Sequence, residues 1–239
     1  MIRSALTCYA IISILTATGQ SDTQAWRHFH LQELIVEQVT KQKRYLPFLD
    51  EGSISAGIYE LRTHDEDRQQ PHLMDEIYFI LNGKSRFNVE SQTTTLEAGD
   101  VLFVRAGLDH KFLDISEDLR TLVWFSGSKN TDHDFYWKKW SAPHKAIPRL
   151  RAENTWDVFL EVPTMVAGVY SLPARVGGDS VLTHKEDEIN YVVKGRAKFA
   201  IGEEEIEVSP GSVIYIKAGT GHRFFDLVGD FQAYIMFVQ

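Results

Sequence analysis

The chain has 239 residues, of which 44% are hydrophobic and 24% are charged, and its formal net charge at pH 7 is −8. These values are typical of an ordered globular protein with room for one large domain or two small ones, and they argue against a disordered chain. No run of Lys and Arg interleaves with aromatic residues, so we expect no nucleic-acid partner and no anionic membrane surface as a partner.

The first 19 residues have the pattern of a secretory signal peptide. Arg3 precedes a mostly apolar stretch, residues 5–17, that is too short to span a bilayer. Small residues at positions 17 and 19 fit a cleavage site after Gly19. A buried or frayed N-terminal segment is the alternative. We expect cleavage, which would give a periplasmic or secreted bacterial protein that has no membrane partner in its mature form.

The only cysteine, Cys8, lies inside this N-terminal segment. Cleavage would therefore leave the mature chain without a thiol. We expect no disulfide framework, no thiolate metal site and no cysteine nucleophile. Candidate ligands and catalytic groups have to come from histidine, carboxylate, amide and phenol side chains.

Short strands separated by turn residues are predicted in both halves. They cover residues 77–81, 84–89, 101–104 and 119–125 in the first half, and 191–193, 197–201, 213–216 and 231–238 in the second. Asn82-Gly83 and Lys194-Gly195 are predicted to form tight turns between strands. Helix is expected only over residues 31–43 and around 132–139, and the polar run 64–67 is expected to be a solvated loop. The pattern predicts an all-β fold of the sandwich or barrel type.

Two parts of the chain resemble each other at a constant spacing. Residues 72–125 align without a gap with residues 184–237 at an offset of 112, and identical residues recur at chemically demanding positions. They include His72, Asp75, Glu76, Gly83, Gly107 and His110 in the first half and His184, Asp187, Glu188, Gly195, Gly219 and His222 in the second. We interpret the chain as two homologous domains, residues 20–127 and 153–239, joined by a connector over 128–152 that packs across them.

Each half carries two histidines and a glutamate in a pattern that suits metal binding. Side chains on an extended segment alternate between faces, so His72 and Glu76 point the same way. The two sets are His72, Glu76 and His110 in the first half and His184, Glu188 and His222 in the second. Two imidazoles and a carboxylate suit divalent Fe, Mn, Ni or Zn and leave coordination positions open. A hydrogen-bonded core histidine is the alternative for any one of them.

Tyr78 is the best candidate for a catalytic group that is not a ligand. Strand alternation puts it on the same face as Glu76, where a phenol could exchange a proton with a bound substrate. An aromatic residue that only lines the barrel is the alternative. Asn190 occupies the matching position, so the two sites need not share an activity. Asp75 and Asp187 point to the opposite face, where we expect solvated charges or hydrogen bonds to turns.

The motif Pro71-His72-x3-Glu76-x6-Gly83, followed by Gly99-Asp100-x6-Gly107-x2-His110, resembles the paired motifs of the cupin superfamily. The second half shows a similar pattern from His184 to His222. The resemblance covers nearly all of both domains. It implies two tandem cupin double-stranded β-helix, or jelly-roll, barrels, each with a metal in its mouth.

The first motif of this family usually carries one more histidine, two residues before the position of His72. That position is Gln70 in the first half and Leu182 in the second. Gln70 could offer a carbonyl oxygen as a fourth metal ligand, whereas Leu182 cannot ligate a metal. The first half is therefore the better equipped one, and the departure prevents the transfer of any particular family member's reaction.

The leading hypothesis is a divalent-metal-dependent enzyme of the dioxygenase or lyase type that acts on a small-molecule substrate. The alternative is a non-enzymatic protein that binds a sugar or another small molecule, with a structural metal or none. A third hypothesis is that only one half keeps a working site. Because no phosphate-binding Gly-rich loop and no Gly-x-Ser-x-Gly elbow is present, nucleotide-dependent and serine-hydrolase chemistry lose support. An exposed strand edge of a barrel could pair with a second copy of the chain, so a homodimer is a further possibility.

Overall fold

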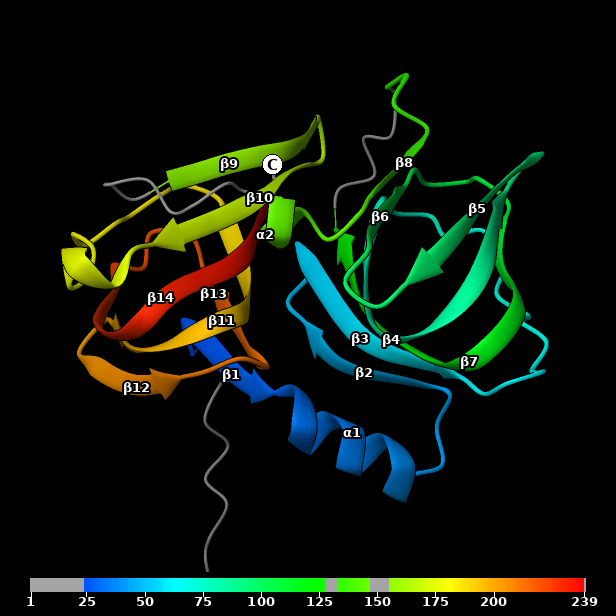
Figure 1. The fold of residues 1–239 in the computed structure, drawn as a ribbon. Helices are drawn as coiled ribbons and strands as arrows, with labels where there is room; N and C mark the ends of the chain where they lie inside the picture. Colours follow the sequence, from blue (N-terminus) through cyan, green and yellow to red (C-terminus); the bar gives the residue numbers. More distant parts are fainter. Residues whose placement is uncertain (1–23, 128–132, 147–154, 239) are drawn as a thin grey trace, which may run out of the picture.

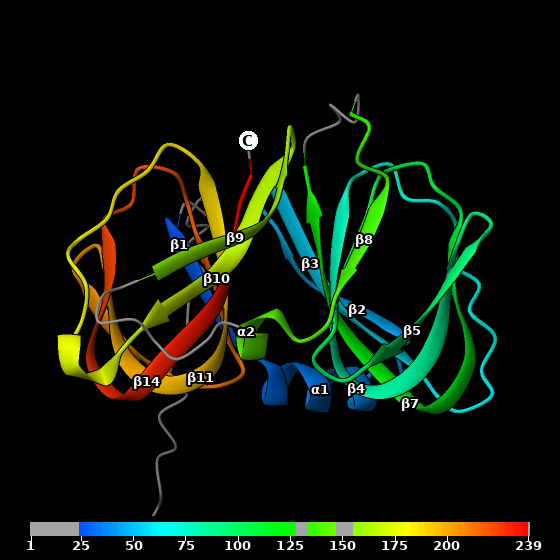
Figure 2. The same ribbon diagram turned by 45° about the horizontal axis from the view of Figure 1, so that its top comes forward.

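Two antiparallel β-sheets, each coiled into a barrel, make up most of the protein (Figures 1 and 2). The structure is a computed structural model that describes residues 24–127, 133–146 and 155–238. The predicted signal peptide, residues 1–19, lies outside these residues. The all-β prediction is confirmed. Within the described ranges, no helix is both long enough and apolar enough to cross a membrane.

The first barrel is built from strands β2 to β8. Their bounds are β2 Tyr45–Asp50, β3 Ile54–Leu61, β4 Glu76–Val89, β5 Gln92–Glu97, β6 Val101–Val104, β7 His110–Ser126 and β8 Trp137–Trp140. The strands follow the order β2-β3-β7-β4-β6-β8, and β5 pairs with β4. The two longest strands, β4 and β7, therefore lie side by side inside the sheet.

The second barrel has a matching order, β1-β13-β11-β14-β10-β9, with β12 paired to β11. Its strands are β1 Trp26–His30, β9 Thr155–Val162, β10 Met165–Leu172, β11 Asp187–Ile201, β12 Glu204–Val208, β13 Ser212–Ile216 and β14 His222–Val238. The helices are α1 Leu31–Thr40, α2 Pro143–Ala146 and the short 3-10 helix Ala174–Val176. Again the longest strands, β11 and β14, are neighbours.

The first strand of the chain joins the barrel of the second half. β1 pairs antiparallel with β13. Helix α1 begins directly after it, capped by Nδ1 of His30, which accepts a hydrogen bond from the N–H of Gln32. From there α1 runs towards the first barrel (Figure 1). The N-terminal segment thus ties the two barrels together, and the helix predicted over residues 31–43 is confirmed, three residues shorter at its end.

The tight turns predicted at Asn82-Gly83 and Lys194-Gly195 are wrong. β4 and β11 run through these pairs as single strands that shift register against β7 and β14. Gly83 has a φ of 90°, and a Cβ at this position would lie 2.4 Å from the carbonyl oxygen of Asp118 on β7. The glycine therefore bends the strand around the barrel where the neighbouring strand leaves no room for a side chain. Pairing along a long strand overrides the local turn signal.

The helix expected around residues 132–139 is also wrong over its described part. Trp137–Trp140 form strand β8, which pairs with β6 so that Trp137 lies opposite Val104 and Trp140 opposite Val101. The edge of β6 offers backbone hydrogen bonds that local helix propensity cannot match. The described part of the connector therefore packs on the first barrel through β8, and α2 lies against β14 of the second.

The largest buried apolar cluster lies between the barrels and contains residues of both. Phe79 of the first barrel packs against Tyr234 of the second, with ring centroids 4.9 Å apart, and against Trp124 at 4.5 Å. Two smaller clusters fill the barrel interiors, one in each barrel. Because a shared core keeps its apolar surface from water only when the halves are packed together, it fixes how the two barrels sit on each other.

Candidate metal centres

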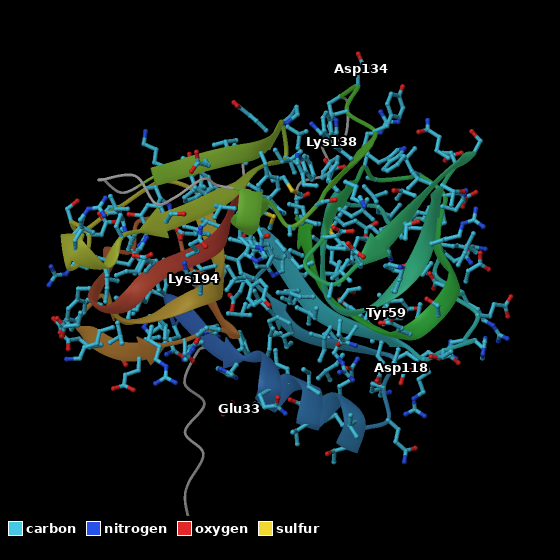
Figure 3. All side chains as sticks on the ribbon, in the orientation of Figure 1. Glu33, Tyr59, Asp118, Asp134, Lys138 and Lys194 are labelled. Atoms are coloured by element: carbon cyan, nitrogen blue, oxygen red, sulfur yellow. The ribbon has the colours of Figure 1, made fainter. Side chains whose placement is uncertain are left out.

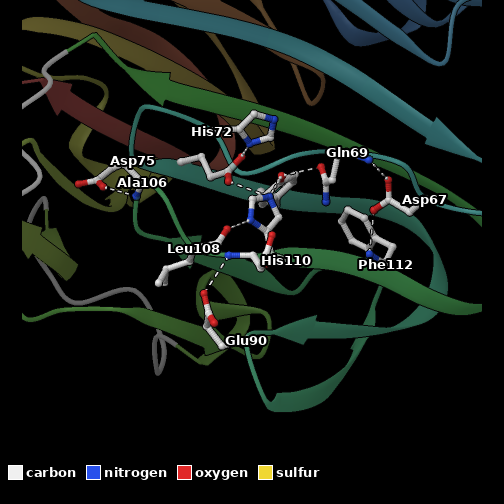
Figure 4. A network of polar contacts seen from close by, with 12 residues as sticks. Asp67, Gln69, His72, Asp75, Glu90, Ala106, Leu108, His110 and Phe112 are labelled. Carbon is white, nitrogen blue, oxygen red and sulfur yellow. Dashed lines mark hydrogen bonds and ion pairs between the residues drawn. The ribbon is translucent and has the colours of Figure 1, made fainter.

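The first barrel brings together His72, Glu76 and His110 (Figure 4). Glu76 begins β4 and His110 begins β7, whereas His72 lies in the loop before β4. One possible ligand atom from each residue lies within 4.8 Å of the other two. Oε2 of Glu76 is 2.9 Å from Nδ1 of His72, and Oε1 is 3.1 Å from Nε2 of His110. Three donor atoms thus surround one point.

A backbone contact determines which nitrogen of His110 is free. Its Nδ1 lies 2.8 Å from the carbonyl oxygen of Leu108, so this nitrogen carries the proton and donates it (Figure 4). Nε2 is left with a lone pair that faces Glu76. A hydrogen bond from the other ring nitrogen is the usual means by which a protein orients a metal-ligating histidine.

Two buried atoms of the first set have no hydrogen-bond partner among the described residues: Nδ1 of His72 and Oε2 of Glu76. They face each other at 2.9 Å without the angles of a hydrogen bond. Because a buried carboxylate oxygen without a partner is costly, this arrangement calls for a further group. A divalent cation with nitrogen and oxygen ligands would satisfy both atoms, so the donor set fits a metal.

The second barrel repeats the arrangement with His184, Glu188 and His222. Oε2 of Glu188 lies 2.5 Å from Nε2 of His184 and 3.3 Å from Nε2 of His222. Nδ1 of His184 donates to the carbonyl oxygen of Glu186 at 2.8 Å, and Nδ1 of His222 donates to that of Thr220 at 2.9 Å. Both Nε2 atoms therefore face the carboxylate, and this set also fits a metal.

The carboxylates and imidazoles shift each other's pKa. Burial alone would raise the pKa of Glu188, but hydrogen bonds from His184 and His222 lower it to about 2. In return, the hydrogen bond to Glu188 raises the pKa of His184. Burial opposes this effect at His222 and His72, yet the neighbouring glutamate makes the net pKa shift of each upward. A bound cation would compete with protons for the same atoms.

Tyr78 reaches the first site from β4. Its hydroxyl lies 3.2 Å from Nε2 of His110 and 3.2 Å from Oε1 of Gln69. Burial raises the pKa of Tyr78 well above its usual value, and the negative charge of Glu76 adds to the shift. The phenol therefore stays protonated at neutral pH and acts as a hydrogen-bond donor at the site.

Gln70 is not brought to the site. Its side chain is exposed, and its Nε2 lies 3.4 Å from the carbonyl oxygens of Arg68 and of Gln69. Gln69 instead contacts Tyr78, whose hydroxyl donates to its Oε1. Gln70 stands where the family motif usually carries its extra histidine, but here this position lies in a loop without strand geometry and its side chain is exposed. The motif position singles out Gln70, and no other pattern in the sequence points to Gln69 in its place.

Asp67 anchors the loop that carries Gln69, and the expectation of a fully solvated run at residues 64–67 is wrong at this position. Asp67 is buried and accepts hydrogen bonds from the Tyr59 hydroxyl at 2.7 Å and from the N–H of Phe112 at 2.8 Å. Figure 3 labels Tyr59 on the first barrel. The carboxylate thus joins the loop to β3 and β7. Nothing in the sequence singles out this acid from its charged neighbours.

Asp75 and Asp187 turn away from the metal sets, as the alternation predicts, but Asp75 is fully buried, so the solvated charge is wrong there. Oδ1 of Asp75 accepts a hydrogen bond from the N–H of Ala106 at 2.8 Å (Figure 4). Oδ1 of Asp187 accepts one from the N–H of Ala218 at 2.7 Å. The alternative of hydrogen bonds to turns is therefore confirmed for both aspartates.

The two sites adjoin cavities of different size. The first cavity measures about 780 Å³ and the second about 220 Å³. The first is lined by Arg44, Tyr45, Ser55, Tyr59, Arg68, Gln69, Pro71, His72, Leu73, Met74, Tyr78, Val123 and Phe125. The second is lined by Trp156, Tyr170, Asp179, Leu182, His184, Glu188, His222, Arg223, Phe224, Ile235 and Phe237. Only the first falls in the size range of typical small-molecule sites.

The second site has no phenol at the position that matches Tyr78. Asn190 takes the position of Tyr78, and its Nδ2 donates to Oε1 of Glu188 at 2.6 Å. Its Oδ1 is buried and has no partner among the described residues. The two sites thus share their candidate ligands but differ in the group beside them and in the space available to a ligand.

Comparison with known proteins agrees with this geometry. The sequence profile of the cupin domain matches the chain twice, over residues 57–125 and 170–238. A protein of Streptomyces coelicolor that is described as uncharacterized is 45% identical over 98 residues, which make up 41% of this chain and 93% of that relative.

Solved structures of similar fold cover most of the chain. A cupin 2 conserved barrel domain protein from Leptotrichia buccalis has a TM-score of 0.66 at 14% identity, over 82% of this chain and 88% of its own. Salicylate 1,2-dioxygenase from Pseudoaminobacter salicylatoxidans, as adducts with gentisate, has a TM-score of 0.73 at 10% identity, over 89% of this chain and 80% of its own. Likeness at such low identity shows the fold alone.

Proposed function

The chain belongs to the cupin domain family, with two cupin domains in tandem, and we propose that it is a divalent-metal-dependent enzyme of the dioxygenase or lyase type that acts on a small molecule. The observation that carries the proposal is the convergence of His72, Glu76 and His110 beside a cavity of about 780 Å³. A metal held by three protein ligands keeps open positions, and a cavity of this size gives a substrate access to them.

The residues of the first site would have different roles, which follow from their chemistry. His72, Glu76 and His110 would hold divalent iron, manganese, nickel or zinc, which supplies Lewis acidity and open positions for substrate oxygen when bound. Tyr78 stays protonated and would donate a hydrogen bond or a proton to the substrate. Oε1 of Gln69 accepts a hydrogen bond from the Tyr78 hydroxyl at 3.2 Å, which would orient the phenol.

The lining of the first cavity favours a small aromatic acid. Tyr45, Tyr59 and Phe125 supply aromatic surface, and Arg44 and Arg68 supply positive charge. Each arginine also pairs with a carboxylate of the loop between β3 and β4, Arg44 with Asp65 and Arg68 with Glu66. The salicylate dioxygenase of similar fold has been solved with gentisate. We therefore propose hydroxybenzoates as the first substrates to test, with catechols, keto acids and sugars as the wider panel.

The second set is proposed to have a structural or binding role rather than the same activity. Its cavity of about 220 Å³ is smaller than typical small-molecule sites, and Asn190 replaces the phenol. Without a protonated phenol beside the ligands, a proton donor for the substrate is missing from this position. Catalysis in the first half alone is the arrangement that these differences favour.

The test uses the full chain, made metal-free and reloaded anaerobically with Fe²⁺ or with Mn²⁺. Oxygen uptake and product formation are followed with salicylate, gentisate, catechol, pyruvate and glucose. We expect turnover of at least one compound, abolished in His72→Ala and retained in His184→Ala, because only the first set would be catalytic. Binding of a panel compound without turnover, unchanged in His72→Ala, would instead support a non-enzymatic binding protein.

Export is proposed on the sequence of residues 1–19 alone. A small-molecule enzyme of this kind would then act in the periplasm or outside the cell. The absence of cysteine from the rest of the chain suits such an oxidising compartment, because no free thiol is left to react.

A further inference from the structure

Two aspartates link the candidate metal sites across the interface between the barrels. Each directly precedes the glutamate of its own metal set. Oδ2 of Asp75 accepts a hydrogen bond at 2.6 Å from the hydroxyl of Thr164, which lies between β9 and β10 of the second half. Oδ2 of Asp187 accepts one from the hydroxyl of Ser53, which lies between β2 and β3 of the first half. Each carboxylate is thus held by a residue of the opposite barrel.

The other oxygen of each aspartate holds the loop that leads to the second histidine of its own set. The N–H of Ala106 donates to Asp75, and the N–H of Ala218 donates to Asp187. His110 and His222 each follow four residues later and begin β7 and β14. One side chain therefore connects three elements: the glutamate segment, the histidine loop and the opposite barrel.

The contact of Asp75 with the opposite barrel is fully buried, and that of Asp187 is partly buried. Asp75 and Thr164 are both fully buried, and Oδ2 of Asp75 also lies 2.8 Å from Nε2 of His133 in the connector. Hydrogen bonds to a buried charged group are worth more than those between neutral groups. Asp187 is only partly buried and takes its further hydrogen bond from the Tyr215 hydroxyl at 3.0 Å. The link to the first site is accordingly the stronger of the two.

The two links are reciprocal. Ser53 and Thr164 are 111 positions apart, the same offset that relates residues 56–59 to 167–170. Each barrel therefore lends one hydroxyl, from the same place in its own fold, to the aspartate of the other. We propose that these hydroxyls are positioning residues for the metal set of the opposite half, Thr164 for the first set and Ser53 for the second.

This inference rests on the proposed metal sites, and the test isolates each of them in the full chain. Glu188→Ala with His184→Ala leaves only the first set, and Glu76→Ala with His72→Ala leaves only the second. Binding of Mn²⁺ alone is then measured by calorimetry in each background. Thr164→Val, which keeps the shape and removes the hydroxyl, and Ser53→Ala are added separately, with Thr164→Ser as the matched control that retains the hydroxyl.

The expected result is a crossed pattern. Thr164→Val weakens Mn²⁺ binding about 10-fold where only the first set remains and by less than about 2-fold where only the second remains, since outer-shell partners tune metal affinity on this scale. Thr164→Ser restores the affinity to within about 3-fold. Ser53→Ala shows the opposite preference, with a smaller effect. Equal losses in both backgrounds, or no loss, would overturn the inference, because a general loss of stability affects both sites.

A second readout separates this inference from the proposed function. If neither background binds Mn²⁺, the metal proposal fails. Amide hydrogen exchange in the metal-free chain then tests whether Thr164 and Ser53 still position the histidine loop of the opposite half. Thr164→Val is expected to speed exchange in residues 105–110, and Ser53→Ala in residues 217–222, because each loop loses an anchor to the opposite barrel. Unchanged exchange in these loops, or faster exchange only in the half that carries the substitution, would contradict it.

Discussion

The hydroxyl of Tyr78 lies 3.2 Å from Nε2 of His110, the ring nitrogen that is left free to bind a metal. The same hydroxyl lies 3.2 Å from Oε1 of Gln69. Once His110 is engaged by a cation, its lone pair is no longer available, so the phenol proton is directed to Gln69 or to a substrate. This places a phenol beside the candidate ligands of the first site, whereas Asn190 stands at the matching position of the second.

Tyr78→Phe removes this donor and keeps the ring. We expect kcat of the metal-loaded enzyme to fall by about 100-fold, a typical contribution of one general acid or base. Metal content should stay as in the unmodified protein, because Tyr78 is not among the ligands. Asn190→Ala, measured in parallel, should leave the same kcat within about 2-fold. Full activity in Tyr78→Phe would mean that the tyrosine only lines the barrel.

Gly83→Ala tests the bend in β4. We expect the free energy of unfolding to drop by about 3 kcal/mol, because alanine has to adopt a φ of 90° and its Cβ would meet the carbonyl oxygen of Asp118 at 2.4 Å. Gly202→Ala is the matched control, since its φ is 58° and no atom lies within 4 Å of its Cβ. Chemical denaturation should show a loss of about 1 kcal/mol for the control. Equal losses of unfolding free energy in the two variants would mean that the positive φ alone, and not the contact with Asp118, destabilises Gly83→Ala.

Asp67→Asn tests the anchor of the Gln69 loop. An amide can accept at only one of its two ends, so either the Tyr59 hydroxyl or the N–H of Phe112 loses its acceptor, and we expect a loss of about 2 kcal/mol of unfolding free energy. Glu66→Gln in the same loop is the control, because Glu66 pairs with Arg68 at the surface. Its effect should stay below about 0.5 kcal/mol. A comparable effect of both changes would refute the anchoring role.

The strand content and the metal sets could be predicted because both depend on local periodicity. Alternation predicts Glu76 and Tyr78 on one face of their strand, and the structure has both there, while His72 reaches the same site from the loop before β4. The recurrence of the same residues in the second half pointed to a second set, which the structure also brings together. Periodicity is informative along a strand such as β4, on which Glu76 and Tyr78 lie.

The errors occur where long-range contacts decide. The local sequence at Gly83 predicts a turn, because the close approach of Asp118 on β7 leaves no trace in a local pattern. Gln70 is the predicted ligand because it stands at the position of the extra family histidine, yet in this loop Gln69 contacts Tyr78 instead. Asp75 was not expected to be buried, since its partner Thr164 lies in the other half of the chain. Contacts between distant segments leave no trace in a local pattern.

The predicted signal peptide leads to an export test. After expression in a Gram-negative host, we expect the protein in the periplasmic fraction to begin at Gln20, because the apolar segment and small residues precede Gly19. Intact-mass measurement and N-terminal sequencing check this. Arg3→Glu, which reverses the charge ahead of the apolar segment, should reduce export. A full-length chain that begins at Met1 and stays in the cytoplasm would contradict the prediction.

The metal content of the purified chain shows whether His72, Glu76 and His110 form a metal site. Metal-free protein is reconstituted anaerobically with Fe²⁺, Mn²⁺, Ni²⁺ or Zn²⁺ in turn, desalted, and analysed by inductively coupled plasma mass spectrometry. With the second set removed by His184→Ala and Glu188→Ala, we predict about one metal per chain for at least one of these ions, lost when His72→Ala and Glu76→Ala are added. Less than about 0.2 metal per chain with every ion, in a protein that remains folded, would mean that these three residues form no metal site.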